Sequence, residues 1–332
     1  MRQSLLERCE AQVRNEEALR KEHRFDFESI VKLAAMMYVN AGREVDVARL
    51  KDCKQILKDE VGLFSNFRGY MQYLVQVKMA LSDDPSAYIG DVLDVYQRLK
   101  QDIKLPGEMA AMAATTIYEN CPAEKRDEVV DKTREAYTRM KAQHRFLTGE
   151  EDLALIALMI IAGIDPEQAA ERAEEIYAIL KEHYLPGSDT PQAAAMVLAL
   201  SDKPVNEKVL NFAELFNACK RAGHATSKDK AMTIYAAYAD LDANRDEVVA
   251  EIGEVDDWLK GHKGYGALGV GASIRRLFAA TIVLEDRQSA GAVTAASTTS
   301  AVAQAVVEEL VLILISIIVT SIVVSSVVQS SS

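Results

Sequence analysis

Apolar residues recur along this chain at helical spacing, in stretches of two alternating kinds. Leu153–Ile161 and Ala193–Leu200 are apolar on every side of a helix, which is typical of a helix surrounded by other parts of the protein. Glu167–His183 keeps a charged face opposite an apolar one, as a helix between core and solvent does. The pattern predicts paired helices, of which the first lies inside and the second covers it.

An apolar residue followed by a lysine recurs along the chain and marks a repeat. The lysines are separated by 42, 41, 40, 39 and 40 residues, and they are Lys58, Lys100, Lys141, Lys181, Lys220 and Lys260. In the four central copies an aromatic residue stands four positions earlier, one helical turn away on the same face; these residues are Tyr96, Tyr137, Tyr177 and Phe216. We therefore expect each copy to end a helix of the same register.

The resulting fold class is all-α, with six helical hairpins of about 40 residues and a final helix. The first helices are predicted at Phe27–Val39, Arg68–Leu81, Gly107–Glu119, Glu150–Ala162, Asp189–Leu200 and Lys228–Asp240. The second helices are predicted at Val45–Lys58, Ser86–Gln101, Ala123–Gln143, Glu167–His183, Asn206–Arg221 and Arg245–Lys260, and the final helix at Leu268–Leu284. Around this repeat domain of residues 26–288 we expect a capping helix at 1–25, an Ala/Ser/Thr linker at 289–305 and a hydrophobic tail at 306–332.

The all-round apolar first helices favour a closed or strongly curved arrangement. In an open array of hairpins, both layers of helices would have one face exposed to solvent. If the hairpins instead curve into a ring, the first helices are enclosed on nearly every side. We therefore expect an α/α toroid-like array or a tightly curved solenoid. A plain helical superhelix with a thick core is the alternative.

Net charge, cysteine spacing and the N-terminal residues limit the partners and the cellular compartment that we expect. The net charge is −12, from 38 Lys and Arg against 50 Asp and Glu, and the sequence contains no concentrated basic stripe, so a nucleic-acid partner is not expected. The four cysteines form no Cys-x-x-Cys pair, which predicts neither a zinc site nor a thioredoxin-type site. The charged N-terminal residues differ from a secretory signal, and we expect a cytoplasmic protein.

The C-terminal tail raises a membrane question. Leu310–Val328 contains 19 residues without a charge, and 14 of them are Leu, Ile or Val. A helix of that length spans about 28 Å, close to the thickness of a bilayer's hydrocarbon core. The run is also rich in β-branched residues and serine and is followed by no lysine or arginine, so burial in a protein or oligomer core is the alternative to a membrane anchor.

The histidines that follow the repeat lysines are the candidate functional residues. In a regular array they would share one edge with the N-termini of the first helices, where a histidine and a carboxylate could act as general acid and base or hold a metal. The candidate residues of this rim are His144, His183, His224, His262, Asp189 and Tyr265. A structural role explains the same positions, because a histidine in the last turn of a helix interacts with the terminal carbonyls and Asp or Ser caps the next helix.

Other motifs predict no chemistry. Asp256-Asp257 lacks the further aspartate of a magnesium–diphosphate site. Gly264–Gly271 contains several glycines before a helix, but no strand precedes it, so a dinucleotide fingerprint fails and a tight connection is expected. We predict no cofactor and no metal.

Three marks suggest a family. Leu105-Pro106-Gly107 reappears as Leu185-Pro186-Gly187, helices end in Tyr-x-x-Leu-Lys, and the tail runs into serines. With these marks the chain resembles a bacterial family known as domain of unknown function 4003, a resemblance that implies no activity. We expect a binding or scaffold module that meets an unknown protein partner or a second copy of itself and is attached to a membrane or an oligomer through its tail. The alternative is an α/α-toroid enzyme, a hydrolase or lyase, working at the histidine rim.

Overall fold

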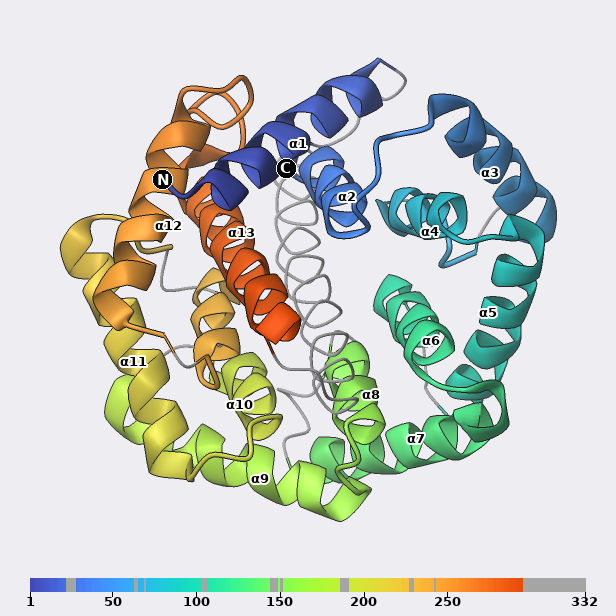
Figure 1. Ribbon diagram of the computed structural model, residues 1–332. Coiled ribbons are helices and arrows are strands. Elements are labelled where there is room, and N and C mark those ends of the chain that lie inside the picture. Colours follow the sequence, from blue (N-terminus) through green and yellow to red (C-terminus); the bar gives the residue numbers. More distant parts are fainter. Residues whose placement is uncertain are drawn as a thin grey trace, which may run out of the picture. The chain divides into compact units, whose positions relative to one another are not determined.

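A computed structural model describes residues 1–21, 28–62, 65–68, 70–102, 107–143, 149, 152–185, 191–226, 230–241 and 243–294. These residues form helices joined by short connections, and no strand occurs among them (Figure 1). The all-α prediction is confirmed. The predicted tail Leu310–Val328 and most of the predicted linker lie outside the described residues.

The helices follow the predicted alternation closely. In chain order they are α1 (Gln3–Arg20), α2 (Glu28–Asn40), α3 (Val47–Glu60), α4 (Tyr70–Leu81), α5 (Pro85–Leu99), η1 (Lys100–Asp102), α6 (Glu108–Asn120), η2 (Ala123–Lys125), α7 (Arg126–Gln143), α8 (Leu153–Ile161), α9 (Pro166–Ile179), η4 (Leu180–Tyr184), α10 (Pro191–Ala199), α11 (Val205–Ala222), η5 (Lys230–Tyr238), α12 (Arg245–Lys260) and α13 (Gly271–Thr294).

The described residues form two compact units, and the divisions between them fall inside α1 and α9. In the unit that holds the described part of Arg14–Glu171, inner helices α2, α4, α6 and α8 contact one another in order, and α3, α5 and α7 pack against the inner helix that follows each of them (Figure 1). In the unit that holds Met1–Val13 and the described residues from Arg172 onward, α10, η5 and α13 form the inner series and α11 and α12 lie against it. Each unit is therefore built in two layers.

Burial separates the two layers as the sequence predicted. Every residue of Met109–Ile117 in α6 and of Leu153–Ile160 in α8 is buried. In α3, by contrast, only Leu50, Cys53 and Leu57 are buried, which gives the stripe of a helix with one wet face. The hydrophobic effect of burying the inner helices is the main stabilising contribution within each unit.

Two inner or connecting segments depart from the predicted α-helix. Lys230–Tyr238 is a 3₁₀-helix, whose three-residue period places Met232, Tyr235 and Tyr238 in one buried row. In this row the Tyr238 hydroxyl donates to the carbonyl of Ala280, and the Tyr235 hydroxyl accepts from the amide of Thr226. The predicted helix at 167–183 ends in a π-turn, Leu180–Tyr184.

The final helix and the first one also differ from their predicted bounds. α13 begins at Gly271 and continues to Thr294, so the first residues assigned to the flexible linker are helical. α1 ends at Arg20 rather than near residue 25. The apolar pattern that predicts the last inner helix stops several residues before α13 ends. Residues 288–294 include Gln, Ser, Ala and Thr, which can occur in a helix but do not predict one.

Three of the repeat lysines contact the tyrosine one turn before them. The ammonium groups of Lys100, Lys141 and Lys181 lie 5.5, 5.0 and 5.2 Å from the ring centres of Tyr96, Tyr137 and Tyr177. Lys141 and Lys181 also donate to the hydroxyl groups of their tyrosines, at 2.8 Å each. The recurring Tyr-x-x-x-Lys spacing is therefore a cation–π pair at the end of an outer helix, in addition to the helix-end charge expected from the sequence.

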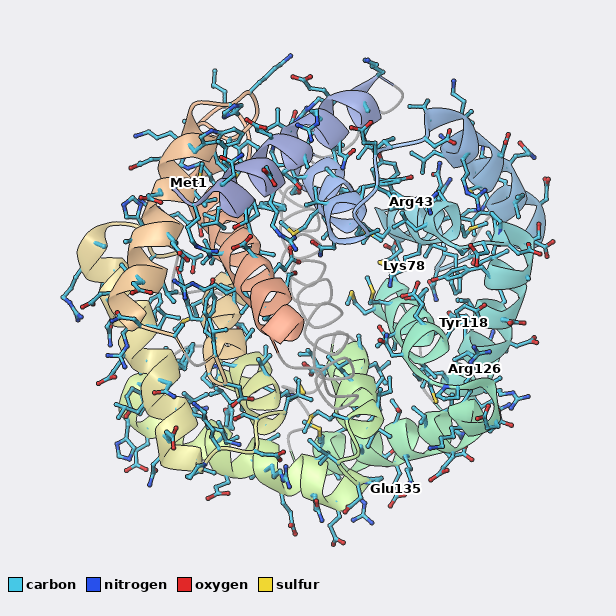
Figure 2. The ribbon with its side chains drawn as sticks, in the orientation of Figure 1. Met1, Arg43, Lys78, Tyr118, Arg126 and Glu135 are labelled. Atoms are coloured by element: carbon cyan, nitrogen blue, oxygen red, sulfur yellow. The ribbon has the colours of Figure 1, made fainter. Side chains whose placement is uncertain are left out.

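Arginines close the carboxyl ends of helices. Arg126, at the start of α7, donates to the carbonyls of Cys121 and Tyr118, and its guanidinium lies 4.2 Å from the ring centre of Tyr118 (Figure 2). Arg49 in α3 donates to the carbonyls of Ala80 and Ser82 at the end of α4. Because terminal carbonyls have no partner within their own helix, a donated hydrogen bond from a cation satisfies them and favours the helix dipole.

The N-terminal residues of α1 pair with acidic residues far along the chain. Arg2 donates to Glu251 at 2.6 Å and lies 2.7 Å from Asp286. Arg8 lies 3.8 Å from both Glu285 and Asp286, and these two acids are buried. The N-terminal segment is thereby bound to α12 and α13 within its unit.

No single helix among the described residues is long and apolar enough to cross a membrane. Within the part of the chain that the structure describes, one bent pair, Leu153–Ile161 and Pro166–Tyr184, with 118° between its parts, meets the requirements of length and composition.

Candidate functional site

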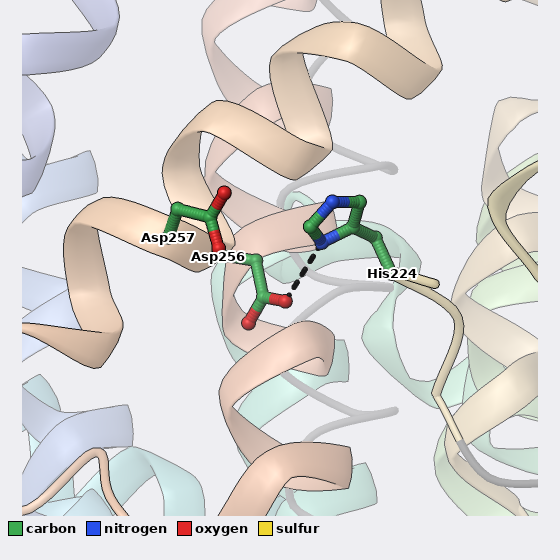
Figure 3. A group of neighbouring side chains, drawn as sticks. All are labelled: His224, Asp256 and Asp257. Carbon is green, nitrogen blue, oxygen red and sulfur yellow. Dashed lines mark hydrogen bonds and ion pairs between the residues drawn. The ribbon is translucent and has the colours of Figure 1, made fainter. Parts of the chain in front are cut away.

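His224 and Asp256 form the central pair of the candidate site (Figure 3). His224 follows Gly223, which ends α11 in the left-handed conformation with φ +82°. Asp256 projects from α12, and its Oδ2 lies 2.9 Å from His224 Nδ1. Because an ionised carboxylate can only accept, Nδ1 carries the proton in this pair, which leaves Nε2 as the basic nitrogen.

Two arginines of α13 complete the shell around Asp256. Arg275 Nε donates to Oδ1 at 2.5 Å, and Arg276 Nε donates to Oδ2 at 3.3 Å. Arg275 also donates to the carbonyl of Tyr265, and Arg276 to that of Ala225. The carboxylate thus connects α11, α12 and α13 through hydrogen bonds that are strengthened by charge.

The environment keeps Asp256 ionised. Only 2% of its surface is exposed. Burial by itself would raise the pKa of Asp256, but the hydrogen bonds from Arg275 and His224 and the positive charges of both arginines outweigh it and hold the pKa below its ordinary value. The group is a fixed negative charge that neutralises part of the buried positive charge of α13.

A glycine makes room for the imidazole ring. A Cβ atom placed on Gly253, one turn before Asp256 on α12, would lie 3.0 Å from both Cδ2 and Nε2 of His224. That distance is shorter than an ordinary van der Waals contact, so the ring would have to move. Gly253 therefore sets the close approach that brings His224 to Asp256.

Two predicted rim residues, His262 and Tyr265, lie in the connection between α12 and α13. His262 stacks on Trp258 with ring centres 3.7 Å apart, and its Nδ1 lies 2.9 Å from the carbonyl of Trp258, which is the helix-end contact expected for a histidine. Tyr265 is fully buried and packs against Phe278, and its carbonyl is held by Arg275.

Other predicted rim residues lie elsewhere. His183 belongs to the exposed π-turn and has its nearest charged partner in Glu182, at 3.7 Å. His144 and Asp189 lie outside the described residues. Of the predicted rim residues, His224 lies in a cluster with Asp256, Arg275 and Arg276, which the sequence analysis did not place in the rim.

The donor atoms of His224, Asp256 and Asp257 lie within 4.8 Å of one another, a spacing that could hold a metal ion. The charges argue against a metal ion there. Both oxygens of Asp256 accept from guanidinium groups, so a divalent cation would have to displace them and lie beside two positive charges. The arrangement suits an internal ion network better than a metal site.

A second polar feature lies between α11, η5 and α12. A pocket of about 260 Å³ is lined there by residues that include Lys203, Glu207, Tyr238 and Arg245. Lys203 pairs with Glu207 at 3.4 Å, and Arg245 pairs with Glu214. The Tyr238 hydroxyl donates a hydrogen bond to the carbonyl of Ala280. These contacts give the pocket no convergent reactive pair.

Sequence reasoning does not find the partners of His224. From the sequence, Asp256 is only half of an acidic pair, and Arg275-Arg276 has no predicted role. A usable signal exists, because two adjacent arginines precede the apolar run of the final helix, and charges near a buried stretch require a partner of opposite sign. Which acid supplies that charge depends on how α12 and α13 pack, which the sequence pattern does not contain.

Comparison with known proteins identifies the family. A family model described as protein of unknown function (DUF4003) matches residues 15–319. No curated protein and no solved structure matches the chain. The chain belongs to the DUF4003 family, as the Leu-Pro-Gly and Tyr-x-x-Leu-Lys marks indicated.

Proposed function

We propose that this protein is a non-enzymatic helical-repeat module that presents a concave or ring surface to a protein partner or a second copy and is attached to a membrane or an oligomer through its C-terminal tail. The observation that carries the proposal is that the charged groups of the candidate site form hydrogen bonds with one another. Both oxygens of Asp256 are used by His224, Arg275 and Arg276, and such a network fixes three helices in place rather than meeting a substrate.

The proposal includes a toroid-like or tightly curved array of hairpins. Its support is the two-layer construction inside each unit, where buried helices are covered by amphipathic ones. Small-angle X-ray scattering of the full chain tests this. A radius of gyration near 20 Å, about that of a compact chain of this length, is expected, and a markedly larger value with an elongated pair-distance distribution would contradict the array.

Attachment through the tail is tested by fractionation. We expect the full chain to enter the membrane fraction or a larger oligomer through its tail, and a chain that ends at Ala305 to lose this attachment. Ile318→Arg, at the centre of the apolar run, should have the effect of the truncation, whereas Ser330→Arg, beyond the run, should not. A full chain that stays soluble and monomeric and is unchanged by the truncation would show the attachment to be wrong.

An enzyme of the α/α-toroid kind is the second candidate, and the His224–Asp256 pair is the observation in its favour. A buried carboxylate that orients an imidazole is a common way to position a general base. Alanine at His144, His183 and His224 tests this role. If the substitutions abolish ligand binding or metal content without unfolding the protein, the enzyme is supported; if stability, metal content and binding are unchanged, it is wrong.

A further inference from the structure

The connection between α12 and α13 presents an unusually exposed leucine. Leu268 is exposed to the extent of a residue in an extended chain, at 107%. The other exposed large apolar residues of the described chain, Leu210, Met1 and Tyr184, reach only 46, 40 and 37%. Ala267 beside it is also exposed, and Val270 is half-buried. Single exposed apolar residues are common on protein surfaces, so the case for a contact at Leu268 depends on the shape of its loop and on the charges beside it.

The loop is built to hold this tip away from the core. Gly264 and Gly271 have φ values of +84° and +75°, and the amides of Val270 and Gly271 donate to the carbonyls of Gly264 and Gly266. A Cβ atom on Gly269 would meet the carbonyl oxygen of Gly264 at 2.0 Å, so the turn requires glycine there.

The base of the loop is anchored as well. Tyr265 is fully buried, and its carbonyl accepts from Arg275. Leu268 therefore projects from a fixed turn, which reduces the conformational entropy lost when the tip meets a partner.

The charges around the tip differ in sign from the chain as a whole. After the exposed Asp257, the segment to Leu284 contains Lys260, Lys263, Arg275 and Arg276 and no further acidic residue, in a protein of net charge −12. The two arginines are engaged by Asp256, but Lys260 and Lys263 are exposed at the base of the loop. The tip is thus apolar with a cationic base.

The small size of this surface distinguishes between partners. A stable protein–protein contact buries about 800 Å² on each side, far more than one leucine with its neighbours can supply. A lipid surface needs no complementary pocket, and short apolar insertions flanked by lysines bind anionic headgroups. We propose that loop 261–270 is a lipid contact, in which Leu268 enters the acyl region of an anionic membrane and Lys260 and Lys263 face the headgroups.

This contact is separate from the tail and goes beyond the proposed attachment. It depends on residues of the repeat body alone, so it holds whether or not Leu310–Val328 crosses a bilayer. One leucine and two lysines give weak and reversible binding, which becomes effective when a second contact holds the protein near the same surface.

The test is a fluorescent reporter on the loop of the full chain. Ala267→Cys is labelled with an environment-sensitive nitrobenzoxadiazole group. The four native thiols will not compete, because they are buried, and burial raises the pKa of Cys9 and Cys219 to about 12 and that of Cys53 to about 11. The reporter is read with vesicles of phosphatidylcholine alone and with vesicles that also contain phosphatidylglycerol.

We expect a blue shift and a rise in emission with the anionic vesicles only. Leu268→Asp in the labelled chain should reduce this apparent affinity about tenfold or more, and Lys260→Glu with Lys263→Glu should remove the preference for phosphatidylglycerol. Leu210→Asp, at an exposed leucine of α11, is the matched control and should change nothing.

Several outcomes would overturn the lipid contact. A reporter that does not respond although the protein binds vesicles would leave only the tail in contact with lipid. A response equal on neutral and anionic vesicles, or one unaffected by Leu268→Asp, would exclude the proposed chemistry. A response to protein concentration without vesicles would show instead that the loop meets a second copy.

Discussion

Asp256 illustrates how one buried carboxylate can organise a helical core. Its two oxygens accept hydrogen bonds from His224, Arg275 and Arg276, so removing the charge would leave the buried guanidinium of Arg275 without its anion. We expect Asp256→Asn to lower the free energy of unfolding by about 3 kcal/mol, the usual cost of breaking a buried ion pair on one side. Urea denaturation measures this. Asp257→Asn, one residue further and exposed, should lie close to the wild-type value, and equal losses for both would contradict the network.

The same carboxylate predicts a dependence on pH. Burial opposes its ionisation, but the arginines and His224 lower the pKa of Asp256 below the ordinary value. A group with a lowered folded-state pKa stabilises the protein above its unfolded pKa, near 3.9, and this stabilisation is lost as the pH falls through the folded value. The difference in unfolding free energy between wild type and Asp256→Asn should therefore be constant from pH 7 to about 5 and narrow below about pH 4. A difference that widens in acid would show that the sign is wrong.

Gly253 offers a test of close packing without a change of charge. Because an added Cβ would lie 3.0 Å from two ring atoms of His224, Gly253→Ala should displace the imidazole and destabilise the protein by about 1–3 kcal/mol. Gly90 is the matched control, since it lies inside α5 and a Cβ atom added there would meet nothing within 4 Å. Gly90→Ala should stabilise by about 0.5–1 kcal/mol through helix propensity. Thermal unfolding of both variants reports the opposite signs.

At the scale of elements, an arginine near the start of one helix donates hydrogen bonds to the free carbonyls at the end of another. Arg126 donates to two carbonyls at the end of α6 and stacks on Tyr118. Arg126→Ala should cost about 1–2 kcal/mol, and Arg126→Lys should recover only part of it, because an ammonium cannot donate in the fork of a guanidinium. The control Arg139→Ala, in an exposed pair with Glu135 on the same helix, should leave the denaturation midpoint unchanged. If lysine restores full stability, the forked geometry is not needed.

The elements that could be predicted from sequence are those whose signal is local. The period of the lysines and the apolar stretches located both ends of α12 and placed α6 and α8 to within three residues, since helical spacing and burial leave a direct mark on the sequence. The 3₁₀ conformation of Lys230–Tyr238 could not be predicted, because the hydrogen bonds that fix its tyrosines come from Thr226 and Ala280. The partner of His224 escapes prediction for the same reason, since Asp256 is 32 residues away in another helix.

At the scale of the molecule, one compact unit is discontinuous in sequence. Met1–Val13 belongs with the described residues beyond Arg172, and Arg2 contacts Glu251 across 249 residues. Burial alone would raise the pKa of Glu251, yet the hydrogen bonds from Arg2 and Arg287 hold it below its ordinary value, so the carboxylate is charged where it meets the N-terminal segment. Acids of α12 and α13 consequently have their partners in the segment Met1–Val13.

This dependence predicts a local loss of structure when the N-terminal cations are removed. Arg2→Gln with Arg8→Gln keeps the length of the chain but leaves Glu251, Glu285 and Asp286 without those charges, so we expect destabilisation by about 3 kcal/mol or more. Hydrogen exchange should show faster exchange in α12 and α13, where those acids lie. Arg14→Gln is the control, because its pair with Glu44 is exposed on both sides, and surface pairs of this kind contribute little. Unchanged protection of α12 and α13 in the double variant would mean that these helices hold their position without the N-terminal segment.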